Sequence, residues 1–314
     1  MKAFALDELG KPGTVRDLEV PEPAEGQVQV RVAAAGLNPF DTAVMQGYLE
    51  GRMQHRFPLV PGLDAYGTVE ALGEGFDAWK IGDDVFGAVG KMYMGEGTVA
   101  EFATMSAGTV ARRPSSMDHS LAAAIPTAGV TALMMADALK LAQGDVVVAV
   151  GATGGVGSFF TQLASARGAR VVAICSGQKA DYAHRLGAAE VIDYMKGDVA
   201  AGVRSIQPGG IDAIAVMHGD AQSISGLVDQ LRPGGRVVSA VGSADVEALA
   251  GRGFEGTNVN GMVATAALDE LAGMLERKGL LAPDIHAFSL KDAAEAYAEV
   301  ATGHVRGKVV VTTV

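Results

Sequence analysis

A glycine-rich segment stands between an apolar run and a predicted helix. Residues 146–157 read VVVAVGATGGVG, with glycine at positions 151, 154, 155 and 157. Without Cβ atoms, such a turn lets a pyrophosphate approach backbone N–H groups at the positive end of a helix. A tight strand-to-helix turn with no ligand would have the same spacing, but the flanking strands and helix favour a dinucleotide site. The expected contacts are Gly154, Gly155, Val156 and Gly157.

The end of the next predicted strand indicates which dinucleotide fits. NAD sites usually carry Asp or Glu there, which binds the ribose hydroxyls and would repel a 2′-phosphate. Here the strand ends at Cys175 and is followed by Ser176, Gly177 and Lys179. A hydroxyl and a cation favour NADPH, although Lys179 is equally consistent with an ordinary solvated lysine. Asp181 would oppose the phosphate, so we expect it on the outer face of the following helix.

The composition excludes several classes of protein. The chain has 314 residues, of which 49% are hydrophobic, and its net charge is −11. This length allows about two domains. The negative charge disfavours nucleic acids and anionic membrane surfaces. We find neither a signal peptide nor a membrane span in the sequence, and the single Cys175 excludes an internal disulfide, so we expect a cytoplasmic protein.

The hydrophobic pattern changes twice along the chain. Residues 1–113 contain short β segments punctuated by glycine and proline, with strict alternation in residues 27–32. Residues 118–258 alternate continuous apolar runs with helical stretches, which is typical of a parallel sheet covered on both faces. The tail contains a strand-like segment at 261–267, helical stretches at 268–280 and 290–303, and a terminal strand at 307–314. We expect this tail to rejoin the first lobe.

Six motifs are spread over the whole chain. They are AAAGLNPFDTAVMQG (33–47), PGLDAYGTVEALGEGFDAWKIGDDVFG (61–87), AVGATGGVG (149–157), LGAAEVIDY (186–194), LRPGGRVVSAVG (231–242) and GKVVV (307–311). Together they resemble the quinone oxidoreductase, or zeta-crystallin-like, branch of the medium-chain dehydrogenase/reductase superfamily. The resemblance implies an α/β fold in which a Rossmann domain, residues 119–259, is inserted into a GroES-like catalytic domain, residues 1–118 and 260–314. It also implies an active cleft at the domain junction and a homodimer.

The zinc-dependent alcohol dehydrogenases of the same superfamily provide a contrast. They bind catalytic zinc through a cysteine after the AAAG strand and through a later Gly-His-Glu. This sequence has Asn38 at the first place, and Leu63 and Asp64 in the second motif. Catalytic zinc needs three ligands of the Cys, His or carboxylate type. Asn38 and Leu63 do not meet that need, so we expect no metal.

Without zinc, a hydrogen-bond donor or solvent must assist a carbonyl substrate. Quinones and α,β-unsaturated carbonyls suit this chemistry because conjugation moves the charge of the incoming hydride to an oxygen. The resemblance places Asn38 and Asp41 at the catalytic position, with the Asn38 amide as donor and also as a nicotinamide neighbour. The alternatives are a turn residue before Pro39 for Asn38 and a helix cap for Asp41. Tyr48 lies one position from the tyrosine of related reductases.

The resemblance implies further cofactor contacts, several of them at carboxyl ends of predicted parallel strands, where ligands of open α/β sheets bind. They are Thr131, Tyr194, His218, Val241, Gly242, Met262, Val263 and Lys308.

The substrate is the least determined part of the prediction. Loops at 45–62 and 87–102 are rich in methionine and aromatic residues, which form adaptable apolar sites but also fill cores. They do not distinguish a quinone from an enone or an aldehyde. A second class of function is a non-catalytic NADPH-binding redox sensor or structural protein, because no strong acid or base stands out. Turnover of NADPH with a panel of quinones and enones separates the two.

Overall fold

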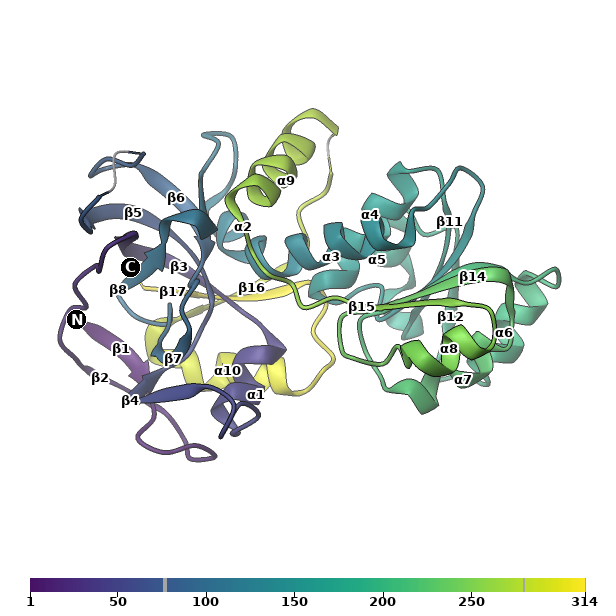
Figure 1. Cartoon of the computed structure of the whole chain (residues 1–314), viewed down its shortest axis with the longest axis horizontal. Coiled ribbons are helices and arrows are strands. Elements are labelled where there is room, and N and C mark those ends of the chain that lie inside the picture. Colours follow the sequence, from purple (N-terminus) through teal and green to yellow (C-terminus); the bar gives the residue numbers. More distant parts are fainter. Residues whose placement is uncertain (76–77, 279, 314) are drawn as a thin grey trace. The chain divides into compact units, whose positions relative to one another are not determined.

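The computed structural model describes residues 1–75, 78–278 and 280–313. They form two compact units, shown with their element labels in Figure 1. Unit 1 comprises Met1–Val130 and Val263–Val314, and unit 2 comprises Thr131–Met262. The first boundary lies further along the chain than the expected position near residue 118, because helix α2 (His119–Ala124) packs against the strands of unit 1.

Unit 2 contains a six-stranded parallel sheet. Its strand order is β12 (Glu190–Asp193), β11 (Arg170–Cys175), β10 (Val146–Val150), β13 (Ile211–Val216), β14 (Leu231–Ser239) and β15 (Glu255–Asn258). This is the Rossmann order: β11 and β12 are added on one side of β10, and β13, β14 and β15 on the other. Residues 146–149 are all buried, as expected of a strand covered on both faces. The predicted α/β fold is confirmed.

Helices connect these strands. They are α4 (Gly155–Ala166), α5 (Ala180–Arg185), α6 (Val199–Ile206), α7 (Ala221–Val228) and α8 (Val246–Gly251), with a short 3₁₀ turn, η2 (Gly177–Lys179), before α5. Asp198, Asp220 and Asp245 cap α6, α7 and α8 by accepting N–H groups of the first turn.

Unit 1 contains a seven-stranded sheet around one long strand. The path is β16 (Ile285–Ser289), β17 (Lys308–Thr312), β3 (Gln27–Leu37), β5 (Asp64–Leu72), β6 (Asp84–Ala88) and β9 (Val110–Arg112), and β8 (Phe102–Ser106) also pairs with β3. Residues 27–32 alternate in burial as predicted. The C-terminal strand β17 pairs antiparallel with β3 and lies beside it in Figure 1, so the expected return of the tail is confirmed.

Smaller elements complete unit 1. They are the paired strands β1 (Lys2–Ala5) and β2 (Thr14–Asp17), the paired strands β4 (Gln54–Val60) and β7 (Tyr93–Glu96), the helices α1 (Pro39–Met45), α9 (Thr265–Lys278) and α10 (Ala293–Ala301), and the 3₁₀ turns η1 (Ala107–Thr109) and η3 (Leu290–Asp292). Helix α3 (Pro126–Leu139) starts in unit 1 and continues into unit 2.

The prediction of a strand at residues 261–267 is wrong. Strand β15 ends at Asn258, and helix α9 begins at Thr265, whose hydroxyl donates to the Val110 carbonyl oxygen at 2.7 Å. Alanine at 266 and 267 favours a helix more than a strand. Gly279, in the predicted helical stretch 268–280, lies outside the described residues, as do Phe76 and Asp77 in the 61–87 motif. None of the helices in the described part of the chain is long and apolar enough to span a membrane.

We expect Gly157, the last glycine of the turn after β10, to be important for stability. A Cβ at Gly157 would lie 2.1 Å from the Gly151 carbonyl oxygen, whereas a Cβ at Gly154 would have that atom at 3.6 Å as its only neighbour. Gly157→Ala should therefore lower the free energy of unfolding by about 1–3 kcal/mol, the usual effect of overpacking. Gly154→Ala is the matched control and should change it by less than about 1 kcal/mol. Equal stabilities of the two variants in urea unfolding would contradict this account.

Candidate functional site

The Asn38 side chain is held between two charged groups of unit 1. Its Nδ2 donates to Asp64 Oδ2 at 2.9 Å, and its Oδ1 accepts from Lys308 Nζ at 2.6 Å. Asn38 follows the last residue of β3 and is the N-cap of α1, while Lys308 opens β17, which pairs with β3. A carboxylate can only accept and an ammonium can only donate, so this arrangement fixes the orientation of the amide. Only 5% of Asn38 is exposed.

Asp64 is the hub of this network. It is fully buried at the start of β5 and also accepts from the backbone N–H and the hydroxyl of Thr127, at 3.1 and 2.6 Å. Thr127 is the second residue of α3, where a carboxylate is favoured by the exposed N–H groups and the helix dipole. A buried carboxylate is costly unless it is paired and hydrogen-bonded, and here it is both. Asp64 thus connects β5, α3 and the Asn38 amide.

Lys308 supplies the positive charge of the cluster. Its Nζ donates to the Leu37 carbonyl oxygen at 2.8 Å as well as to Asn38, and it lies 3.9 Å from Asp64 Oδ2. Burial lowers the pKa of Lys308, and both Asp64 and Asp41 oppose that shift. Burial likewise raises the pKa of Asp64, against the effects of Lys308, Thr127 and Asn38. Sequence reasoning named Lys308 as a cofactor contact but missed its bond to Asn38 and the role of Asp64.

Asp41 adds a second buried carboxyl group. Its Oδ2 accepts the backbone N–H of Asn38 at 2.8 Å, which is the helix-cap contact that the sequence offered as an alternative to catalysis. Burial raises the pKa of Asp41 to about 7. The cap and a catalytic role are compatible, because the contact uses one of the two carboxyl oxygens.

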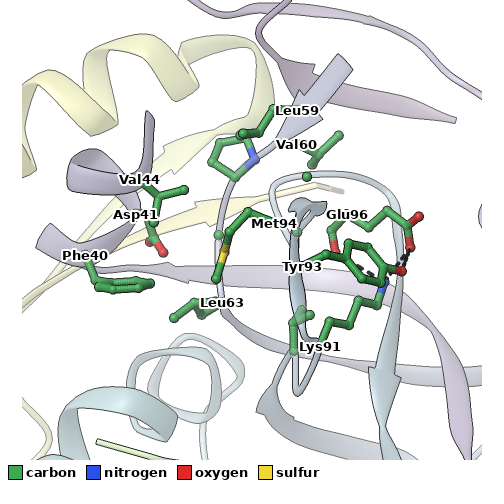
Figure 2. Close-up of a pocket in the computed structure, with 15 residues that line it drawn as sticks. Phe40, Asp41, Val44, Leu59, Val60, Leu63, Lys91, Tyr93, Met94 and Glu96 are labelled. Atoms are coloured by element: carbon green, nitrogen blue, oxygen red, sulfur yellow. Dashed lines mark hydrogen bonds and ion pairs between the residues drawn. The ribbon is translucent and has the colours of Figure 1, made fainter. Parts of the chain in front are cut away.

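A small pocket in unit 1 adjoins Asp41 (Figure 2). Its apolar wall includes Phe40, Val44, Leu63 and Met94, and a polar part is formed by Lys91, Tyr93 and Glu96. Lys91 Nζ and Tyr93 OH both donate to Glu96 Oε2 at 2.7 Å. Sequence reasoning missed this polar set because ordinary surface residues in a loop would have the same pattern.

Some of the methionine and aromatic residues in the two predicted substrate loops line the pocket, and others are exposed to solvent. Met94 lines the pocket, whereas Met92 is 87% exposed and Tyr48 is also exposed. Of the aromatic residues in these loops, Tyr93 lines the pocket and Phe57 is exposed.

The predicted pyrophosphate residues lie at the carboxyl end of β10 in unit 2. Gly151 has a φ of +82°, a left-handed conformation that glycine adopts without strain. Gly154 is the N-cap of the twelve-residue helix α4, so the first-turn N–H groups of Gly155, Val156 and Gly157 belong to that helix end. His218 follows β13, and its Cβ lies 3.1 Å from the Cβ position of Gly151. The neighbouring strands β10 and β13 therefore bring these two loops together.

A carboxylate missed by the sequence analysis lies at the predicted phosphate contact. Ser176 stands at the N-cap position of η2, which contains Gly177 and Lys179, and its side chain makes no capping hydrogen bond within the described residues. Asp193, at the end of the neighbouring strand β12, packs so closely on Gly177 that a Cβ there would lie 2.4 Å from Asp193 Oδ2. Lys196 Nζ is 3.6 Å from the same oxygen.

The remaining predicted contacts lie around the same end of the unit 2 sheet or at its boundary. The buried Ser239 hydroxyl accepts N–H groups of Val241 and Ser243 and so shapes the loop that contains Gly242. Tyr194, Val241 and Met262 are exposed, whereas Thr131 is buried in α3. Val263 is the first residue of the second segment of unit 1. Within the described part of the chain, no group of three or more His, Cys, Asp or Glu side chains could hold a metal ion.

Two protein families match parts of the chain, and individual proteins match nearly all of it. Residues 24–115 match the alcohol dehydrogenase GroES-like domain family, and residues 186–311 match a family described as zinc-binding dehydrogenase. A mitochondrial NAD(P)H oxidoreductase of Bos taurus is 28% identical over 357 residues, covering 100% of this chain and 89% of that protein. A solved structure of the quinone oxidoreductase from Coxiella burnetii has a TM-score of 0.90 at 28% identity and covers 100% of this chain and 99% of its own.

One further similarity is high enough in identity and coverage to assign the family. The quinone oxidoreductase of Sus scrofa is 31% identical over 323 residues, which cover 98% of this chain and 95% of that protein. The GroES-like match in unit 1 and the Rossmann sheet of unit 2 agree with it. The chain therefore belongs to the quinone oxidoreductase branch of the medium-chain dehydrogenase/reductase superfamily.

Proposed function

We propose that this chain reduces a quinone or an α,β-unsaturated carbonyl with NADPH and without zinc. The observation that carries the proposal is the Asn38 amide, whose orientation is fixed by Lys308 and Asp64. An amide has two N–H groups, and the described contacts use only one of them. The second N–H is therefore a pre-oriented donor for a substrate oxygen.

The residues of unit 2 fit a nicotinamide dinucleotide. A Cβ at Gly154 would have open space on all sides except toward the Gly151 carbonyl oxygen, so this turn leaves room for a phosphate at the start of α4. Ser176 and Lys179 would bind the 2′-phosphate of NADPH. Asp193 opposes that phosphate, and Lys196 partly offsets its charge. When bound, the cofactor supplies the hydride.

Asn38 would then act on the charge that develops in the transition state. Hydride addition to a conjugated carbonyl or quinone places negative charge on an oxygen, and a fixed N–H donor stabilises that oxyanion without reorganising. Lys308 holds the amide oxygen and Asp64 holds one amide hydrogen, so the other hydrogen keeps its direction during the reaction. Neither charged group needs to move.

The same contacts argue against zinc at this position. The Asn38 oxygen already accepts from a buried ammonium, and Lys308 is only 3% exposed. A Zn²⁺ ion would have to displace that cation and would find Leu63 where a histidine ligand is needed. The positive charge that a metal would bring is already supplied by Lys308.

The pocket of unit 1 is the proposed substrate-binding surface. Its apolar wall of Phe40, Val44, Leu63 and Met94 would contact one edge of a conjugated ring or chain, because the cavity of about 30 Å³ is too small to enclose it. The family resemblance implies a homodimer, and the sequence pattern is the ground for expecting a cytoplasmic location.

We expect NADPH to bind more tightly than NADH. Removing a charge-assisted contact to the 2′-phosphate by Lys179→Ala should weaken NADPH binding by about 10-fold to 100-fold and leave NADH nearly unchanged. Asp193→Asn is the complementary variant and should strengthen NADPH binding, because it removes a carboxylate beside Gly177. Titration calorimetry with both cofactors measures these effects. Equal affinities of the wild type for NADPH and NADH would contradict the preference.

We expect the purified protein to contain no stoichiometric zinc and to keep its activity in a chelator. The reason is that Asn38 and Leu63 cannot serve as the required ligands. Elemental analysis beside NADPH oxidation before and after chelation tests this. One zinc per chain that is lost together with activity would overturn the expectation.

We expect Asn38→Ala to lower kcat by about 10-fold to 1000-fold, the range for losing one oxyanion donor. Asn38→Asp should be at least as damaging, because a carboxylate cannot donate and would face Asp64. Cofactor affinity should change much less. Single-turnover hydride transfer with a quinone and an enone, beside Tm, measures the effect.

One outcome would contradict the donor role of Asn38, and another would contradict the reductase function. Unchanged transfer in well-folded Asn38 variants would mean that the donor lies elsewhere. Cofactor binding by the wild type without NADPH consumption by any quinone or enone would favour a sensor or structural protein over the reductase.

A further inference from the structure

The pocket of unit 1 contains a carboxyl oxygen without a protein donor among the described residues. Asp41 Oδ2 accepts the Asn38 N–H, but no group of the described residues donates to Asp41 Oδ1. Figure 2 shows the Asp41 carboxyl group between the side chains of Phe40, Leu63 and Met94. Asp41 is only 2% exposed, so these apolar neighbours replace water around it.

The charges around Asp41 favour one bound proton. Two buried carboxyl groups, Asp41 and Asp64, share a single buried ammonium, Lys308. Asp64 accepts hydrogen bonds from Asn38 and Thr127 and lies nearer its counter-charge, so it holds the negative charge. With a proton on Asp41 the cluster is neutral, which is the less costly state in a buried site.

Two further observations agree with a proton on Asp41. Burial raises its pKa to about 7, with Asp64 adding to the rise, while the Asn38 N–H and Lys308 oppose it. From α10, the buried Tyr297 hydroxyl has no hydrogen-bond partner among the described residues, and burial, followed by Asp41, raises the pKa of that phenol. Tyr297 supplies no charge that would hold Asp41 ionised.

The other ionisable groups of the cluster and pocket are less suited to give up a proton. Lys308 donates to two oxygens and neutralises Asp64. Tyr93 already donates to Glu96, and its pKa is raised to about 12, first by burial and then by Glu96. Lys91 also donates to Glu96, and its side chain is almost fully enclosed. Asp41 alone among these groups borders the pocket with an oxygen that no protein donor occupies.

We propose that Asp41 is the general acid that gives its proton to the substrate oxygen during reduction. This inference rests on the proposed reductase function. The substrate accepts a hydride at carbon from NADPH, which is oxidised, and the conjugated π electrons move to the substrate oxygen. The Asp41 O–H bond breaks, an O–H bond forms on the substrate, and Asp41 is left as a carboxylate. It takes a proton from water before the next cycle. Asn38 stabilises the oxyanion by a hydrogen bond, and Asp41 protonates it.

The test compares the wild type with Asp41→Asn, which keeps an oxygen for the Asn38 N–H and cannot transfer a proton. A general acid must be protonated, so wild-type kcat with an enone should fall as pH rises above about 7. Asp41→Asn should lower kcat by about 10²-fold to 10⁴-fold and abolish that fall. Thr42→Val is the matched control on the same helix: it removes a buried hydroxyl without a partner and should keep the wild-type rate and pH profile.

A stability measurement locates the proton without using activity. The pKa of Asp41 in the folded protein is raised from 3.8 to about 7, so its contribution to stability is fully present below pH 3.8 and is lost as pH rises through 7. The Tm of the wild type minus the Tm of Asp41→Asn should therefore decrease across this window. A constant difference would contradict a proton on Asp41 and overturn the inference.

The outcomes separate the donor role from the proposed function. Enone turnover with the same pH profile in Asp41→Asn and wild type would overturn the donor role and leave the reductase function intact. Failure of the wild type to consume NADPH would overturn both. If Asp41→Asn does not fold, the wild type still decides, because a kcat that stays constant between pH 6 and 9 would contradict a donor with a pKa of about 7.

Discussion

The arrangement of unit 1 depends on the need to satisfy one fully buried carboxylate, that of Asp64. It accepts hydrogen bonds from Asn38 at the end of β3 and from Thr127 at the start of α3, and Lys308 of β17 lies beside it. These residues are far apart in the sequence, so each bond joins a different segment. Removing one partner would leave a charge without compensation in a dry site, which is usually more damaging than losing a surface ion pair. Pairing of β17 with β3 is therefore also what delivers the counter-charge.

This structural requirement has a chemical consequence. The groups that neutralise Asp64 also set the direction of the Asn38 amide and occupy its oxygen with a cation. In the proposed zinc-independent reduction, the oriented Asn38 amide and the positive charge of Lys308 take the place of a metal. Since one ammonium cannot neutralise two carboxylates, the second carboxyl group, that of Asp41, is left as a proton carrier beside the pocket.

The sequence predicted the parts of the fold that rest on local patterns. The continuous apolar runs gave the parallel strands of unit 2, and the alternation in residues 27–32 gave the start of β3. The prediction of a strand at residues 261–267 was wrong because apolar residues are common in both strands and helices. The contact of Thr265 with Val110 is tertiary, so the local sequence does not reveal it. Asp64 could be placed beside Asn38 only by knowing which strands pair. The same holds for Asp193 beside Gly177, and for the bond between Asn38 and Lys308 across the length of the chain. Predicted roles for individual cofactor contacts remain predictions.

The central claim is that hydride passes directly from the nicotinamide to a conjugated carbonyl substrate. The most direct measurement is the mass and deuterium position of the product formed by the wild type from an enone and NADPH deuterated at the transferring C4 position. The account predicts one deuterium at the β-carbon of the product and a solvent-derived hydrogen at the α-carbon. A reduced product without deuterium at the β-carbon, formed from fully labelled cofactor of the correct face, would contradict it.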